Sequence, residues 1–504
     1  MKKNKNKKPK ITFVVILMML STLLILTTLY LTLNFRNKGI KDLIFQIKGG
    51  VQGTAPNVIR RVILLNIAPF LGIMAVLLIP IWIVWKKTGF RTKVSRRIKS
   101  IYPIGVFIVS CLSFYVFLDG PGYLKAVFQD SEMIEQRYVR PENVKLKFPE
   151  KKRNLILIIA ESIENSVMNK DIGGGWNYTI MPELEKLALE NTVFSNTDKL
   201  GGFYQTEGTS WSIAGMTGIM SGIPIKGFVN NQYKSTNFLN GAYALGDILR
   251  KEGYNNEVIM GSKSEFGGKR QFFKNHGNYD IFDLYHAVAN GYMDYEDKVW
   301  WGYEDSKLFK WSKEEITKLA NDDKPFNFVI ETVNTHFTDG YLEPGDIEKF
   351  PTQYENVHAQ SSKQIGEFID WVKQQDFYEN TTIVILGDHL GMQDKFYQEN
   401  MIEGYDRTVF NTFINAPIEA NHNKNRIATS FDMYPTILAS IGVEIEGDRM
   451  GLGTNLYSGK ETLTEEMGYK NFNEELKKNS EFYNEEILQD DAEDAITLRK
   501  SKKD

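Results

Sequence analysis

Three apolar segments of the sequence are each followed by residues of the types that bind metal ions or transfer protons. Carboxylates and imidazoles are ligands that a divalent cation such as Mn²⁺ or Zn²⁺ accepts. The pattern therefore indicates a metal site to which distant parts of the chain contribute. The segments and the residues after them are 154–160 with Glu161, 325–330 with His336, and 381–386 with Asp388 and His389.

These segments are predicted to be strands of one sheet. Each is an unbroken apolar run of strand length, which is typical of a strand buried on both faces of a parallel sheet. Open α/β sheets bind ligands beyond the carboxyl ends of their strands, so we expect Glu161, His336, Asp388 and His389 at a shared edge. The alternative for each residue is ordinary: a carboxylate that caps the next helix, or a histidine that is hydrogen-bonded at the surface.

A glycine-rich stretch, residues 201–216, offers a hydroxyl as a nucleophile. It contains Glu207-Gly-Thr-Ser-Trp-Ser and is predicted to lead into a helix. The positive end of the helix dipole favours phosphate at this point, and a bound metal ion would lower the pKa of the Thr209 hydroxyl. The alternative is that Thr209 or Ser210 only caps the helix.

Helical patterns lie between the apolar segments. Strands that alternate with helices predict an α/β fold with a mostly parallel sheet flanked by helices. Residues 461–504 are charge-rich and are expected to form a surface helix or a partly disordered tail. The helical patterns cover residues 181–190, 242–252, 354–374 and 430–441, and a further strand is expected at 409–414.

The first 119 residues are predicted to form a membrane domain. Three uncharged apolar runs, at about 11–33, 62–85 and 101–118, each approach the roughly 20 residues that cross a bilayer. The first run is too long for a signal peptide and lacks a small-residue cleavage site after it, so we interpret it as an anchor. Lysines and arginines in residues 1–10 and 86–100 place both segments in the cytoplasm, which leaves the chain after residue 119 outside.

The remaining boundaries and exclusions follow from composition. Residues 120–152 are interpreted as a linker and 153–460 as an extracytoplasmic catalytic domain, followed by the charged tail. The net charge of -3 gives no case for a nucleic-acid partner. The single cysteine, Cys111, lies in the third apolar run, which excludes an intrachain disulfide and a thiolate metal cluster.

The candidate catalytic and metal-binding residues occur in a recognisable order along the chain. That order resembles the lipoteichoic acid synthase and phosphoglycerol transferase family of the sulfatase/alkaline-phosphatase superfamily, over about residues 154–457. The sequence Gly-Thr-Ser-Trp-Ser-Ile-Ala-Gly-Met, residues 208–216, is more similar to the phosphoglycerol transferases that decorate glucans than to lipoteichoic acid synthases proper. The motifs that carry the resemblance are residues 154–165, Glu207 to Gly215, Thr332-x-x-Thr335-His336, Gly387-Asp388-His389, and Asp432-x-x-Pro435.

The resemblance implies a sulfatase-like catalytic domain with one divalent metal ion, usually Mn²⁺ in the family, with Zn²⁺ or Mg²⁺ as alternatives. His336 matches a histidine that contacts the transferred group and protonates the leaving group. Lys269, or its neighbour Arg270, lies where the family has a phosphate-contacting arginine. The positions that match the metal ligands are Glu161, Thr209, Asp388 and His389, with Thr209 also matching the nucleophile.

The function implied by the resemblance is transfer of glycerol phosphate from phosphatidylglycerol, or a related lipid, to a cell-envelope glycan or glycerol-phosphate polymer through a phospho-threonine intermediate. The alternatives are a phosphoethanolamine transferase of the same superfamily and a catalytically inactive envelope-binding protein. A sulfatase would need cysteine or serine in place of Thr209. Members of the family commonly have five or more transmembrane helices, whereas three are expected here, so the acceptor stays open.

Overall fold

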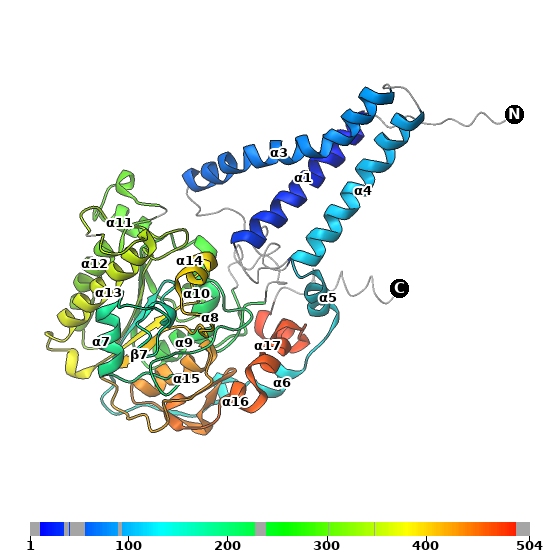
Figure 1. Cartoon of the computed structure of the whole chain (residues 1–504). Coiled ribbons are helices and arrows are strands. Elements are labelled where there is room, and N and C mark those ends of the chain that lie inside the picture. Colours follow the sequence, from blue (N-terminus) through cyan, green and yellow to red (C-terminus); the bar gives the residue numbers. More distant parts are fainter. Residues whose placement is uncertain are drawn as a thin grey trace. The chain divides into compact units, whose positions relative to one another are not determined.

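A computed structural model describes residues 11–34, 40, 56–88, 93–226, 238–300, 302–346 and 348–489 of the 504-residue chain (Figure 1). The chain divides into two compact units, residues 1–47 with 54–126 and residues 48–53 with 127–504. Long apolar helices dominate the described part of the first unit. Every strand among the described residues belongs to the second.

Among its described residues, the first unit contains three helices with a stretch long and apolar enough to span a membrane: Phe13–Leu33, Asn66–Val84 and Ser100–Phe117. These stretches agree with the three predicted runs, while the orientation in the membrane stays a prediction. The hydroxyl of Thr22 donates to the carbonyl of Met18 at 2.8 Å, which satisfies a polar group without water. The helices are α1 (Ile11–Asn34), α3 (Pro56–Thr88) and α4 (Lys93–Phe117), followed by α5 (Gly120–Phe128).

A six-stranded sheet in the order β4-β3-β5-β2-β6-β7 forms the centre of the second unit. All neighbouring strands are parallel except β6 and β7, which are antiparallel. The mostly parallel sheet predicted from the apolar runs is confirmed. The strands are β2 (Asn154–Ala160), β3 (Asn255–Met260), β4 (Asp280–Phe282), β5 (Phe326–Glu331), β6 (Thr381–Gly387) and β7 (Asn411–Ile414).

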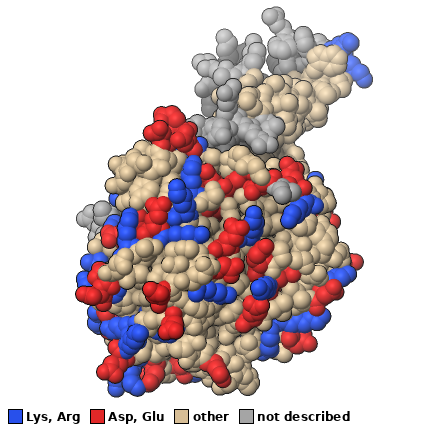
Figure 2. Space-filling model, turned by 90° about the vertical axis from the view of Figure 1, so that its left-hand side faces the viewer, with Lys and Arg blue, Asp and Glu red and all other residues tan. Residues whose placement is uncertain are grey.

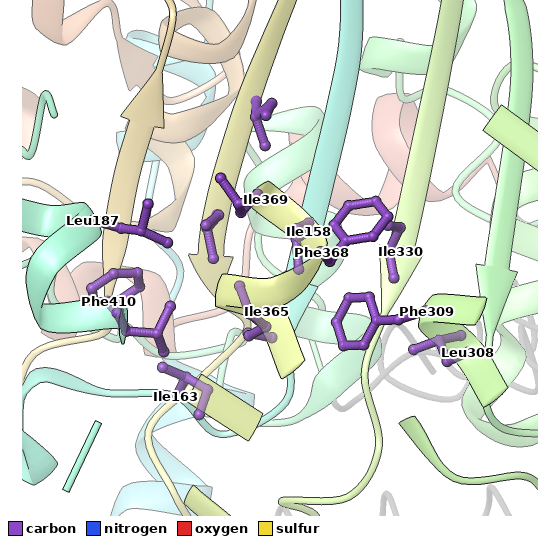
Figure 3. Close-up of a cluster of buried hydrophobic side chains, with 14 of the residues drawn as sticks. Ile158, Ile163, Leu187, Leu308, Phe309, Ile330, Ile365, Phe368, Ile369 and Phe410 are labelled. Atoms are coloured by element: carbon purple, nitrogen blue, oxygen red, sulfur yellow. The ribbon is translucent and has the colours of Figure 1, made fainter. Parts of the chain in front are cut away.

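Helices cover both faces of the sheet. On one face α13 packs against α7 and α12, and on the other α15 packs against α8. Figure 3 shows Ile365, Phe368 and Ile369 of α13 over the strand residues Ile158 and Ile330. These five side chains are fully buried, and each such side chain stabilises the fold by roughly 1.5–3 kcal/mol. The helices are α7 (Pro182–Glu190), α8 (Ser212–Ser221), α9 (Leu245–Lys251), α10 (Lys269–Asn275), α11 (Leu284–Ala289), α12 (Asp305–Ala320), α13 (Gln353–Val372), α14 (Asp394–Asn400) and α15 (Ser430–Ser440).

The segments on either side of the predicted catalytic domain are also folded. In the predicted linker, α6 (Met133–Arg137) precedes β1 (Leu146–Lys147), which pairs with β8 (Glu444–Ile445). The charge-rich tail forms α16 (Leu463–Met467) and α17 (Tyr469–Lys477), red in Figure 1. Phe472 and Leu476 anchor α17 because both are buried. A last hairpin joins β9 (Arg449–Met450) and β10 (Gly453–Thr454).

The face of the molecule in Figure 2 carries basic and acidic side chains interspersed. On this face neither sign forms one continuous area, in keeping with a net charge close to zero.

Candidate metal centre

Glu161, Asp388 and His389 meet at the carboxyl ends of two neighbouring strands. Ala160 of β2 lies opposite Gly387 of β6, so the next residue of each strand, Glu161 or Asp388, leaves the sheet at the same level. Nε2 of His389 lies 3.3 Å from Oδ2 of Asp388 and 3.5 Å from Oε1 of Glu161. One ligand atom from each of these buried residues lies within 4.8 Å of the others.

Local hydrogen bonds orient both carboxylates. The amides of Ser162 and His389 each donate to Oδ1 of Asp388 at 2.8 Å. The hydroxyl of Ser162 donates to Oε1 of Glu161 at 2.7 Å, and that of Ser212 donates to Oε2 at 2.9 Å. Ser162 reaches both carboxylates because its backbone adopts a left-handed conformation, with φ of 55°.

The electrostatics of the two carboxylates, Glu161 and Asp388, favour a bound cation. Burial raises the pKa of Asp388 well above its ordinary value, and the charge of Glu161 raises it further. Burial would also raise the pKa of Glu161, but His389, His336 and two serine hydroxyls hold it below its usual value. Two adjacent carboxylates cannot both ionise without a compensating positive charge.

His389 is oriented as a ligand. Its Nδ1 donates a hydrogen bond to the carbonyl of Leu390 at 2.9 Å, which leaves the lone pair of Nε2 on the side of the carboxylates. Two carboxylates and a neutral imidazole suit Mn²⁺ or Zn²⁺. Glu161, Asp388 and His389 therefore fit the divalent ion that the sequence predicts.

Thr209 lies in the loop before α8, whose first residue, Ser212, contacts Glu161. Its hydroxyl donates to the carbonyl of Thr206 at 2.9 Å and accepts from the amide of Thr206 at 3.0 Å. The second bond is of the kind that stabilises an oxygen carrying negative charge. Gly208, with φ of 78°, makes the turn before the threonine. The role of Thr209 as nucleophile and ligand stays a prediction.

His336 lies in the turn after β5, close enough to Glu161 for the carboxylate to raise its pKa. Burial has the larger effect and lowers the pKa of His336 below its ordinary value. Nδ1 of His336 donates to the carbonyl of Phe337 at 2.7 Å, and Trp300 packs nearly perpendicular to the ring. An imidazole whose pKa lies below its ordinary value is neutral near pH 7, and a neutral imidazole can take up a proton from a hydroxyl.

Lys269 and Arg270, both predicted to bind substrate, differ in their surroundings. Nζ of Lys269 donates to both oxygens of Glu331, at 2.7 and 3.0 Å, and to Ser262 at 2.7 Å. The ion pair is almost completely buried, with each side chain 3% exposed. Arg270 is exposed and donates to Ser264 at 3.3 Å. Both assignments to substrate stay predictions.

Several residues that support the site escaped the sequence analysis. Asp305 accepts from the amides of Val333 and Asn334, and so holds the turn that carries His336. Ser162 and Ser212 bind the Glu161 carboxylate, although neither belonged to the predicted site. The sequence offered one usable signal for Ser162, because this residue directly follows Glu161, a predicted ligand at a strand end.

Comparison with known proteins places these observations in context. A family model described as Sulfatase matches residues 153–443. Phosphoglycerol transferase I of Xanthomonas euvesicatoria pv. vesicatoria (strain 85-10) is 26% identical over 385 residues, which are 74% of this chain and 52% of that protein. Phosphoglycerol transferase I of Citrobacter koseri is 31% identical over 257 residues, 49% of this chain and 32% of that protein. The chain thus spans about half the length, or less, of these curated relatives.

Among solved structures, the lipoteichoic acid synthase LtaP from Listeria monocytogenes aligns with a TM-score of 0.50 and 19% identity. The alignment covers 65% of this chain and 82% of the synthase. At this identity the likeness concerns the fold alone. Together with the family match, it confirms the predicted sulfatase-like α/β class.

Proposed function

The chain belongs to the sulfatase family, and within it we propose a membrane-anchored phosphoglycerol transferase whose catalytic domain lies outside the cytoplasm. The donor is phosphatidylglycerol, and the acceptor is a hydroxyl of an envelope glycan or glycerol-phosphate polymer. The observation that carries the proposal is the buried group of Glu161, Asp388 and His389 beside the Thr209 loop. Three apolar helices in the same chain suit a lipid donor.

Glu161, Asp388, His389 and the hydroxyl of Thr209 would hold one divalent ion, Mn²⁺ in our proposal. Such an ion lowers the pKa of a bound hydroxyl and neutralises charge on phosphoryl oxygens. The protein's own part is to fix the carboxylates through Ser162 and to keep the Thr209 oxygen on the amide of Thr206.

The proposed transfer has two steps with Thr209 as the carrier. Oγ1 of Thr209 forms a bond to phosphorus while the bond from phosphorus to the diacylglycerol oxygen breaks. The neutral ring of His336 takes the hydroxyl proton and passes it to the leaving oxygen. In the second step the oxygen of an acceptor hydroxyl forms a bond to phosphorus while the bond from phosphorus to Oγ1 of Thr209 breaks. His336 carries the proton of the acceptor hydroxyl to Oγ1, which restores Thr209. In this proposal Arg270 adds positive charge near the phosphate, and Lys269, whose charge Glu331 balances, contacts the phosphate as a hydrogen-bond donor.

Mass spectrometry of the purified chain after incubation with phosphatidylglycerol and Mn²⁺ tests this function. We expect a peptide containing Thr209 to gain the mass of glycerol phosphate with loss of water, and Thr209→Ala to gain none. An adduct formed only from phosphatidylethanolamine would favour the phosphoethanolamine alternative. Absence of an adduct and of lipid turnover would favour the inactive binding protein.

His336→Ala separates its catalytic role from a structural one. We expect the variant to keep its fold and Mn²⁺ binding but to lose lipid turnover, because the proton relay is gone. Near-normal turnover would remove His336 from the mechanism, and an unfolded variant would assign it to holding the turn.

A further inference from the structure

The loop that carries Thr209 is held from outside by α17, which lies beyond the part of the chain that the family model matches. The hydroxyl of Tyr469 donates to the carbonyl of Gln205 at 2.6 Å. Oδ1 of Asn473 accepts from the amide of Glu207 at 2.7 Å. These two hydrogen bonds hold the loop at Gln205 and Glu207, four and two residues before Thr209.

Tyr469 and Asn473 are four residues apart and so lie on one face of α17. A neighbouring face is fixed to the domain, because Phe472 and Leu476 are buried and the ring of Phe472 packs against Phe431. The ring of Tyr469 also packs against Tyr204, with 4.9 Å between centroids. The helix is therefore a rigid support and not a loosely attached tail.

Gln205 connects this support to the metal centre. Its carbonyl accepts from Tyr469, while its side-chain Oε1 accepts from the amide of Leu390 at 2.8 Å. The carbonyl of Leu390 in turn accepts from Nδ1 of His389 at 2.9 Å. One chain of hydrogen bonds thus leads from α17, through the nucleophile loop, to a candidate metal ligand.

We propose that Tyr469 and Asn473 are positioning residues that hold the Thr209 loop in its reacting geometry against the metal centre. The inference rests on the proposed role of Thr209. Neither side chain touches the reacting atoms in this proposal. Their effect is to fix the backbone that presents the nucleophile, where a displacement of about 1 Å can reduce the rate by about 100-fold.

The test compares variants of the full-length chain in detergent by hydrogen–deuterium exchange and by steady-state kinetics. Asn473→Ala removes the acceptor, whereas Asn473→Asp keeps an acceptor oxygen. Tyr469→Phe removes one hydroxyl and keeps the ring. Asn471→Ala is the matched control, since Asn471 is an exposed residue of the same type on the same helix.

We expect faster exchange in peptides covering residues 203–211 for Asn473→Ala and Tyr469→Phe, with rates like those of the unchanged protein for Asn473→Asp and Asn471→Ala. With phosphatidylglycerol, kcat should fall about tenfold in the first two variants while KM stays unchanged, because each loses a hydrogen bond to the loop but no contact with substrate. The melting temperature reports whether folding is intact.

Unchanged exchange in both variants, or faster exchange with unchanged kcat, would overturn the inference. A chromogenic phosphodiester, bis(4-nitrophenyl) phosphate, keeps it separate from the proposed function. Turnover of this compound but not of phosphatidylglycerol by the unchanged protein would refute the lipid donor, while the variants would still measure the positioning effect. If the unchanged protein turned over neither compound, the proposed function and the inference built on it would both fail.

Discussion

Replacing Arg407 should lower the stability of the protein, because a buried carboxylate next to the metal centre loses its counter-charge. Nε and Nη2 of Arg407 donate to the two carboxylate oxygens of Glu164 at 2.8 and 2.6 Å, and Nη2 also donates to the carbonyl of Gly391 at 2.7 Å. Glu164 also accepts from the amide of Gly391 at 2.7 Å. The pair therefore clamps the loop that follows His389 to the loop that follows Glu161.

Arg407→Met keeps most of the side-chain length but leaves Glu164, which is 0% exposed, without its counter-charge. Removing one partner of a buried pair costs about 3–5 kcal/mol. For a unit as large as residues 127–504 this corresponds to a fall in Tm of roughly 4–6 °C. Tryptophan fluorescence of the purified full chain during heating measures the change. Adding Glu164→Gln to Arg407→Met should recover more than half of the loss, because the unpaired charge is removed.

Lys147→Met provides the control. Lys147 lies 2.8 Å from Glu444, but their side chains are 70% and 72% exposed, so the loss of this ion pair should leave Tm unchanged. Two results would refute the reasoning: a Tm for Arg407→Met within about 2 °C of the unchanged protein, or a double variant less stable than Arg407→Met alone.

Three further perturbations test other parts of the structure. Asp388→Asn should abolish the rise in Tm on adding Mn²⁺, because it removes a metal ligand. It should not lower the Tm of chelator-treated protein, because it also removes a buried carboxylate beside Glu161. A rise in Tm with Mn²⁺ that persists in the variant would contradict the site. Burial lowers the pKa of His358 from 6.5 to about 3, so its contribution to stability is complete above pH 6.5 and is lost as the pH falls toward 3. About 2 kcal/mol should disappear between pH 7 and 5 in denaturant titrations, and His358→Phe should flatten that slope. A reporter fused after residue 150 should be active only outside the cytoplasm; cytoplasmic activity would reverse the proposed orientation.

The strand ends were predictable because their physical cause is local. An apolar run of strand length that is rich in isoleucine favours a buried strand, and a parallel sheet brings the ends of such strands to one edge. The register that pairs Ala160 with Gly387 then turns two separate sequence positions into adjacent carboxylates. Sequence alone could not predict that register, but it could predict the edge of the sheet at which the ligands lie.

The support around the site was harder to foresee. Lys269 and Glu331 form their ion pair across 62 residues, and nothing near either residue in the sequence indicates the partner. A surface helix or a partly disordered segment was expected in the tail, but its composition did not reveal that α17 packs on the domain, because charged residues outnumber the two apolar anchors Phe472 and Leu476. Its contacts depend on side chains meeting a distant loop, which local patterns do not encode.

The central position of β2 has a consequence for how the domain forms. β2 is synthesised before the other five strands of its sheet, yet its partners lie far along the chain. Oδ1 of Asn154 accepts from the amide of Phe326 in β5, 172 residues away, and Nδ2 of Asn154 donates to the hydroxyl of Thr381 in β6, 227 residues away. During export under the proposed topology, the apolar run of β2 emerges long before either neighbour arrives. Sheets built from such distant pairings form slowly and leave apolar surface open meanwhile. We therefore expect residues 154–160 to stay unpaired outside the membrane until β5 and β6 have crossed.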